Sequence, residues 1–250
     1  MSRHTILVVE GYHDRAFWAG WLAKRGWHDP GVLRDGPRRT VTDPLGKQVK
    51  GGGHFAFRRN SSFVRIVPAG GDSQVLPAAM QSLQSAQLDR AATGAIDHVV
   101  MSLDADVGPA VTQDRIRDSL SRTIEPVTST ESPWHLCNHT IRVDVAFWQS
   151  REAPTDSFGN DTLEAVIAHA LRSVRPAWWA AVDTWLKSRP EPPQRTAKEL
   201  TWSIMAGWFA EQGCESFLQH ALWEDDDLAN AIASELEHTG ISDIVAAMEA

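Results

Sequence analysis

The chain has 250 residues, of which 42% are hydrophobic and 22% are charged, as in an ordinary soluble globular protein. No apolar run approaches the ~20 residues that a membrane-spanning helix needs, so we expect no membrane span. The net charge of −8 argues against a protein that simply coats nucleic acid. Two cysteines cannot form a disulfide framework and fit a reducing compartment, so we predict a cytoplasmic protein.

Strand and helix patterns alternate in the first part of the chain. Residues 6–9, 63–67, 98–103 and 140–148 have the composition of β-strands, and helical periodicity separates them. This order predicts parallel βαβ units, and therefore an α/β fold with a parallel sheet of about four strands flanked by helices. A long stretch rich in Gly, Pro and basic residues, at about 28–62, interrupts the pattern and is predicted to be an insertion.

After residue 151 the pattern predicts helices only. They are expected at about 161–173, 176–186, 196–212, 214–223, 226–238 and 241–248. We therefore predict a first domain over residues 1–150 and a helical C-terminal region over 151–250, packed on or beside it. Most tryptophans lie at helical spacing among apolar residues, which predicts core packing for Trp18, Trp21, Trp178, Trp179, Trp185 and Trp208.

Acidic residues follow two of the predicted strands directly. Glu10 ends the first strand, and Asp104 and Asp106 end the third. In an open parallel sheet the carboxyl ends of the strands meet at one edge, where ligands bind. Asp14 lies one helical turn after Glu10 and is expected to project toward the same edge. Converging carboxylates need a cation, and hard oxygen ligands suit Mg²⁺, Mn²⁺ or Ca²⁺. Each acid alone is also a common helix cap or turn former.

These motifs resemble those of Toprim domains. Residues 8–14 (VVEGYHD) resemble the opening Toprim motif, a hydrophobic strand followed by Glu-Gly-x-x-Asp. Residues 102–106 (SLDAD) resemble the Asp-x-Asp motif, and residues 67–71 (VPAGG) resemble the Gly-rich turn after the second strand. The resemblance covers about residues 3–150 and implies a Rossmann-like Toprim sheet. Primases, topoisomerases, ribosomal-RNA maturases and OLD-family nucleases share this domain.

The resemblance implies a role for each acid. Glu10 would be a general acid/base or a metal ligand, and Asp104 and Asp106 would be metal ligands and part of the catalytic set. The additional acid Asp14 resembles that of OLD-type and small stand-alone Toprim nucleases, which implies one or two Mg²⁺ or Mn²⁺ ions. Two such ions would stabilise the attacking and the leaving oxygens in phosphodiester cleavage.

Glu164, Lys198 and Tyr12 also bear on the resemblance. Glu164 resembles the acid of a Leu-Glu element that supplies a further metal ligand, and Lys198 resembles a lysine that stabilises transition-state charge. Both have ordinary alternatives, a favourable helix N-terminus for Glu164 and a solvated face for Lys198. The chain's one tyrosine, Tyr12, lies beside the metal motif, outside the context of a topoisomerase's catalytic tyrosine.

The charges suggest where partners would bind. Between residues 28 and 65 there are eight basic and three acidic residues, whereas residues 211–250 contain ten acidic residues and no Lys or Arg. The basic stretch predicts phosphate contacts, for which the candidates are Arg38, Arg39, Arg58, Arg59 and Arg65. Two solvated loops of opposite sign that attract each other would give the same pattern, and this alternative stays open.

The resemblance predicts a Mg²⁺- or Mn²⁺-dependent Toprim nuclease that acts on DNA or RNA. Small Toprim proteins of this kind resemble effectors of phage-defence or toxin systems, which implies an activating protein partner or a homo-oligomer. Two alternatives are kept. One is primase-like nucleotidyl transfer with the same metal chemistry, and the other is a non-enzymatic Toprim scaffold or regulatory subunit whose acidic helical region docks a partner.

Overall fold

The structure, a computed structural model, describes residues 3–28, 40–42, 48–50, 55–88, 95–104, 108–137, 140–149, 162–188 and 213–249. It has α/β architecture, as predicted, with a six-stranded mixed sheet in the order β4-β5-β1-β6-β8-β7. The strands of this sheet are β1 (His4–Val9), β4 (Phe55–Arg59), β5 (Ser62–Pro68), β6 (His98–Asp104), β7 (Trp134–Leu136) and β8 (Ile141–Trp148). A separate antiparallel ribbon consists of β2 (Thr40–Thr42) and β3 (Gln48–Lys50).

The sheet has more strands than the four expected from the sequence. The neighbours β5, β1, β6 and β8 pair in parallel, and these are the four predicted strands. An antiparallel strand is added at each edge, β4 beside β5 and β7 beside β8. β4 turns into β5 through Asn60, whose φ of 54° is a conformation that Asn tolerates better than most residues. β7 has three residues, too few to show a periodicity in the sequence.

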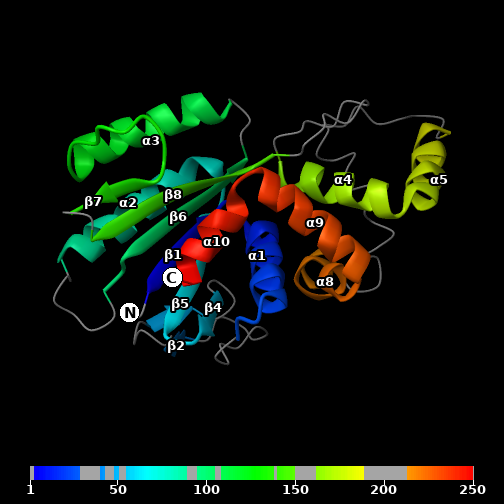
Figure 1. Cartoon of the computed structure of the whole chain (residues 1–250), viewed down its shortest axis with the longest axis horizontal. Helices are drawn as coiled ribbons and strands as arrows, with labels where there is room; N and C mark the ends of the chain where they lie inside the picture. Colours follow the sequence, from blue (N-terminus) through cyan, green and yellow to red (C-terminus); the bar gives the residue numbers. More distant parts are fainter. Residues whose placement is uncertain are drawn as a thin grey trace.

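Helices cover both faces of the sheet. Their bounds are α1 (Tyr12–Lys24), α2 (Asp72–Leu88), α3 (Pro109–Thr123), α4 (Leu163–Val174), α5 (Pro176–Lys187), α7 (Cys214–Ser216), the π-helix η1 (Phe217–Ala221), α8 (Leu222–Glu224), α9 (Asp226–His238) and α10 (Ile241–Glu249). α2 lies on one face, and α1 and α10 lie on the other (Figure 1). The helix predicted over 196–212 lies outside the described residues. No helix in the described ranges is long and apolar enough to cross a membrane.

Two hydrophobic cores follow from the alternation of side chains along the central strands. On β1, Ile6 and Val8 face the core formed with α2 and α3, whereas Leu7 and Val9 face the core formed with α1 and the C-terminal helices. Burial on both faces explains why these strands are continuous apolar runs in the sequence. The core formed with α1 and the C-terminal helices joins the sheet to residues beyond 162. The division into two domains at residue 150 stays a prediction.

Aromatic side chains fill the space between α1 and the sheet. Trp148, at the end of β8, lies 5.3 Å from Phe17 and 5.6 Å from Trp18 between ring centroids, and Phe17 lies 5.1 Å from Trp223. The Trp18 indole also donates to Ser102 Oγ on β6 at 3.0 Å. Each aromatic pair of this kind contributes about 0.5–1.5 kcal/mol beyond the burial of its area.

The prediction of core packing for the tryptophans is only partly correct. Trp18, Trp21 and Trp179 are buried, whereas Trp178 and Trp185 on α5 lie at the surface. α5 continues away from the sheet beyond α4 (Figure 1), so one face of this helix meets the core and the other does not. Trp208 lies outside the described residues.

Gly20 allows α1 to lie against η1 at very short range. A Cβ at this position would lie 2.1 Å from Trp223 Nε1 and 2.6 Å from the Gln219 carbonyl oxygen. The Trp223 indole is itself fixed by a 2.8 Å hydrogen bond to the Leu218 carbonyl. The indole and the backbone of η1 therefore occupy the space that any other residue at position 20 would need.

We expect Gly20→Ala to lower the free energy of unfolding by about 1–3 kcal/mol, the usual cost of overpacking a core. In a helix with free space around the glycine, the same change would raise the free energy of unfolding by about 0.5–1 kcal/mol. The sign of the measured change therefore shows whether α1 lies as close to η1 and Trp223 as the structure describes. Urea denaturation followed by tryptophan fluorescence measures the difference. Ala23→Ser adds one heavy atom at an exposed position of the same helix and should change stability by less than about 0.5 kcal/mol.

Candidate functional site

The carboxyl ends of β1 and β6 bring Glu10 and Asp104 together. The two strands pair in parallel with Val9 opposite Ser102, so the residues that follow meet at the same edge. Glu10 Oε1 accepts a 2.7 Å hydrogen bond from the Asp104 backbone N–H. Residues separated by 94 positions in the chain are thus joined directly. Asp106 lies outside the described residues.

Asp14 reaches the same edge from the first turn of α1. Its Oδ2 accepts from the Gly11 backbone N–H at 3.2 Å, which orients the carboxylate at the start of the helix. Its Oδ1 accepts from the Trp148 indole N–H at 3.0 Å. Because Trp148 is the β8 partner of Asp104 in the sheet, Asp14 is held over the ends of β6 and β8.

The start of α4 completes this edge on the side of β6. Asp104 Oδ1 accepts from the Leu163 backbone N–H at 3.2 Å, so α4 begins at the end of β6. Glu164 follows in the first turn of α4 and is buried. Burial, together with the nearby carboxylates of Glu164 and Glu215, raises the pKa of the Cys214 thiol to about 12. The Glu164 carboxylate therefore lies near Cys214 at the beginning of α7.

The Gly-rich turn after β5 holds the backbone of Glu10. Both Gly70 and Gly71 donate their N–H groups to the Glu10 carbonyl, at 3.0 and 2.8 Å. Their φ values of 91° and 134° lie in a region that side-chain-bearing residues rarely adopt, which accounts for glycine at both positions. The turn singled out in the sequence thus contacts the proposed catalytic acid directly.

The chemistry of these acids fits a hard divalent cation. Mg²⁺ and Mn²⁺ prefer carboxylate oxygens, and ligating carboxylates are usually oriented by hydrogen bonds from neighbouring groups. Glu10, Asp14 and Asp104 each accept such a bond. Among the described residues, which do not include Asp106, no three Asp, Glu, His or Cys side chains are grouped as a metal site requires. The metal therefore stays a prediction.

The predicted phosphate contacts fall in different environments. Arg58 is exposed on β4, and Arg59 forms an ion pair with Glu249 of α10. Arg65 is 4% exposed on β5, and burial lowers its pKa to about 10. A guanidinium buried to this extent offers little surface to a phosphate, and the phosphate contact expected for Arg65 stays a prediction. Arg38, Arg39 and Lys198 lie outside the described residues.

Sequence reasoning missed two residues that shape this edge, Trp148 and Arg15. Trp148 was part of a predicted strand, but nothing local indicated that its N–H would meet Asp14. Arg15 is 3% exposed and forms an ion pair with Glu215, 200 positions away. A charged residue inside the apolar helix pattern of residues 13–25 was the one available signal for Arg15.

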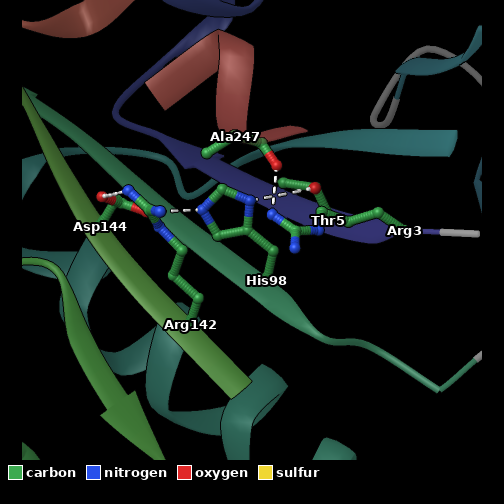
Figure 2. Close-up of polar contacts among 6 residues, drawn as sticks. All are labelled: Arg3, Thr5, His98, Arg142, Asp144 and Ala247. Carbon is green, nitrogen blue, oxygen red and sulfur yellow. Dashed lines mark hydrogen bonds and ion pairs between the residues drawn. The ribbon is translucent and has the colours of Figure 1, made fainter. Parts of the chain in front are cut away.

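A second polar cluster lies at the opposite ends of the same strands (Figure 2). His98 on β6 lies between Thr5 on β1, at 3.3 Å from Nδ1 to Oγ1, and Asp144 on β8, at 2.7 Å from Nε2 to Oδ2. Arg142 donates to both carboxylate oxygens of Asp144, at 2.6 and 3.0 Å. Arg3 beside this row donates to the Ala247 carbonyl and so joins β1 to α10. Thr5, His98 and Asp144 are buried, whereas Arg142 at the edge of the cluster is partly exposed.

Burial and hydrogen bonds together determine the protonation of this cluster. It lowers the pKa of His98, and the hydrogen bond with Asp144 opposes this only in part. Burial raises the pKa of Asp144, but the hydrogen bonds from His98 and Arg142 outweigh it and hold that pKa below its usual value. The Asp144 hydrogen bond raises the pKa of Arg142, and burial raises that of the neighbouring Asp97. A neutral His98 therefore donates Nε2–H to an ionised Asp144.

Comparison with protein-family models gives no match, and comparison with curated proteins gives none. Among solved structures, the fold is similar to the crystal structure of a hypothetical protein from Pyrococcus horikoshii OT3. The match has a TM-score of 0.66 and covers 99% of this chain and 100% of that chain. Sequence identity is 13%, so the similarity shows a shared fold and carries no function.

We expect His98 to make the protein less stable as the pH falls below about 6.5, its ordinary pKa. In that range the unfolded chain binds a proton at His98 and the folded chain does not, so acid favours unfolding. The contribution of Asp144 is lost only at lower pH, as the pH falls below 3.8 toward its folded pKa. Urea denaturation at pH 7.5, 6.5 and 5.5 measures the slope.

His98→Gln should be less stable at pH 7.5 and should show a smaller loss of stability between pH 7.5 and 5.5. His238→Gln removes an exposed histidine of α9 and should leave the wild-type slope unchanged. An identical pH slope in wild type and His98→Gln would contradict the neutral state of buried His98.

Proposed function

We propose that this protein is a Toprim-type nuclease that hydrolyses phosphodiester bonds of nucleic acid with Mg²⁺ or Mn²⁺. The observation that carries the proposal is the 2.7 Å hydrogen bond from the Asp104 N–H to Glu10 Oε1. It places the acids of two motifs at neighbouring carboxyl ends of a parallel sheet, where α/β proteins bind their ligands. The four parallel strands, with helices on both faces, support a Rossmann-like Toprim arrangement.

Each acid has its own role in the proposed reaction. Glu10, oriented by the Asp104 N–H, would accept the proton of the attacking water or act as a ligand. Asp104 and Asp106 would hold the first cation, and Asp14, oriented by Gly11 and Trp148, would hold a second. When bound, the cations would neutralise charge on the phosphate and its leaving oxygen. An effector role in phage defence or as a toxin remains part of this proposal.

Supporting roles are proposed for four other residues. Glu164 would be a further ligand, since α4 begins beside Asp104. Lys198 would stabilise charge on the phosphate in the transition state. Arg38 and Arg39 of the basic stretch would contact phosphates, which positions nucleic acid without selecting a sequence.

A non-enzymatic scaffold is the second candidate, and one observation favours it. The described acids accept hydrogen bonds within the protein, and no three of them are grouped as a metal site among the described residues. In that case exposed acids of the C-terminal helices, such as Glu224, Asp227 and Glu237, would dock a basic partner. Primase-like nucleotidyl transfer would use the same acids as the nuclease, so its test is the polymerisation of nucleotides on a primed template.

We expect wild-type protein to cut plasmid, single-stranded DNA or RNA in Mn²⁺ and to lose this activity in EDTA. Glu10→Gln keeps an oxygen acceptor for the Asp104 N–H but removes the carboxylate, and should reduce the rate by about 100- to 10,000-fold. The double substitution Asp104→Ala/Asp106→Ala should abolish cutting. Gel-based cleavage assays measure each rate.

Glu237→Gln, at an exposed position of α9, is the matched control and should cut like wild type. Melting temperatures of all variants identify any loss of folding. Cleavage that survives in Glu10→Gln and in the Asp104/Asp106 variant would locate the activity elsewhere. A wild type inactive on every nucleic acid would favour the scaffold.

We expect Trp148→Phe to weaken Mn²⁺ binding by about 10- to 100-fold, the usual effect of removing a group that orients a metal ligand. Phenylalanine keeps an aromatic ring against Phe17 but removes the N–H that holds Asp14. Titration of Mn²⁺ followed by electron paramagnetic resonance measures the affinity without any catalytic turnover.

The matched control is Trp18→Phe, which removes an equally buried indole N–H whose acceptor is Ser102 rather than a carboxylate. It should bind Mn²⁺ with an affinity within about threefold of wild type, since metal ligands are not involved. Equal losses in both variants would assign the effect to packing of the aromatic core and not to Asp14.

A further inference from the structure

One aromatic side chain at the acid-bearing edge is exposed and yet held in place. Tyr12, the first residue of α1, is 58% exposed. The Arg15 guanidinium carbon lies 4.8 Å from the centroid of the Tyr12 ring, within cation–π range. The same carbon lies 4.0 Å from the centroid of Phe55, a buried residue of β4. Tyr12 is thus attached to the protein core through Arg15.

Arg15 is rigidly placed, which orients the tyrosine ring. Its side chain is almost fully buried and forms an ion pair with Glu215. Burying a guanidinium without a partner is costly, so the ion pair with Glu215 and the contact with Phe55 fix its position. A cation fixed over an aromatic ring restricts the tilt of that ring. Tyr12 therefore presents much of its surface to solvent in a defined orientation.

The topology of the sheet determines where Tyr12, Arg15 and Phe55 lie relative to the acids. Tyr12 follows Glu10 by two residues, and Phe55 pairs with Ile66 near the carboxyl end of β5. Asp14 and its partner Trp148 lie toward β8. Glu10 is therefore flanked by an aromatic surface on the β5 side and by a carboxylate on the β8 side.

We infer that Tyr12 stacks on an unpaired nucleobase next to the phosphate that reacts beside Glu10, and that the substrate is single-stranded nucleic acid. This inference rests on the proposed nuclease function. Nucleobases stack on aromatic side chains regardless of their sequence. Within a duplex the faces of a base are covered by its neighbours, so a single exposed ring selects bases that are unpaired or extruded.

The test is the binding of fluorescently labelled oligonucleotides, measured by anisotropy with Ca²⁺ in place of Mg²⁺. The probes are a 12-nucleotide single-stranded DNA, the RNA of the same sequence and the corresponding DNA duplex. Tyr12→Leu keeps an apolar side chain but removes the ring, and should weaken single-strand binding by about 5- to 100-fold, the value of one stacked base. Its duplex binding should change less than twofold.

Two control variants accompany it. Tyr12→Phe keeps the ring and should bind single strands within about twofold of wild type, because stacking does not need the hydroxyl. Val111→Ala changes an equally exposed apolar residue on α3 and should have no effect. Melting temperatures show whether Tyr12→Leu keeps its fold.

The outcomes separate this inference from the proposed function. Wild-type cleavage of single strands with Mn²⁺, together with unchanged binding by Tyr12→Leu, would overturn the stacking role and leave the nuclease intact. A wild type that prefers the duplex would overturn the choice of substrate. A wild type that neither binds nor cleaves any probe would overturn both proposals.

Discussion

The parallel pairing of β1 with β6 is the constraint on which the rest of this structure depends. It aligns the carboxyl ends of two strands that are about 90 residues apart, so that Glu10 meets the Asp104 N–H at 2.7 Å. Parallel pairing requires a long crossover, and α2 with β5 provides it while covering the sheet. The Gly70–Gly71 turn at the end of β5 then holds the Glu10 carbonyl. A shift of one residue in this register would turn the acids to the wrong faces.

Charged side chains have different surroundings at the two ends of the central strands. At the amino ends, the charge of buried Asp144 is compensated by Arg142, and His98 is a further hydrogen-bond partner. At the carboxyl ends, Glu10, Asp14 and Asp104 lie close together and accept hydrogen bonds from neutral N–H groups. Carboxylates that gather at a ligand-binding edge are the physical basis for expecting a cation there.

The C-terminal helices contribute to the site as well as to the fold. α4 places its first N–H on Asp104, Glu215 of α7 pairs with Arg15, and η1 packs against Gly20. Through Arg15, α7 also acts on the orientation of Tyr12. The acid-bearing edge is thus assembled from the sheet on one side and from helices near the end of the chain on the other.

Much of this could be predicted from local patterns, because strand and helix periodicities depend on neighbouring residues. The four parallel strands, most helices of the described ranges and the position of Glu10, Asp14 and Asp104 at strand or helix ends were legible in the sequence. The single helix expected over 214–223 is instead α7, the π-helix η1 and α8. The short strand β7, the burial of Arg65 and the exposure of Trp185 were not. Each depends on which surfaces meet, and a side chain's own neighbours in the chain do not report that.

The sequence by itself determined the alternation of elements and the types of side chain at each strand end, since these follow from residue composition and spacing. Only the tertiary structure decided that the Trp148 N–H meets Asp14, that Arg15 is buried against Phe55 and Glu215, and that His98 is enclosed between Thr5 and Asp144. These contacts join residues 40 to 200 positions apart. Their energies arise from burial and hydrogen bonding that exist only once the sheet and its covering helices have come together.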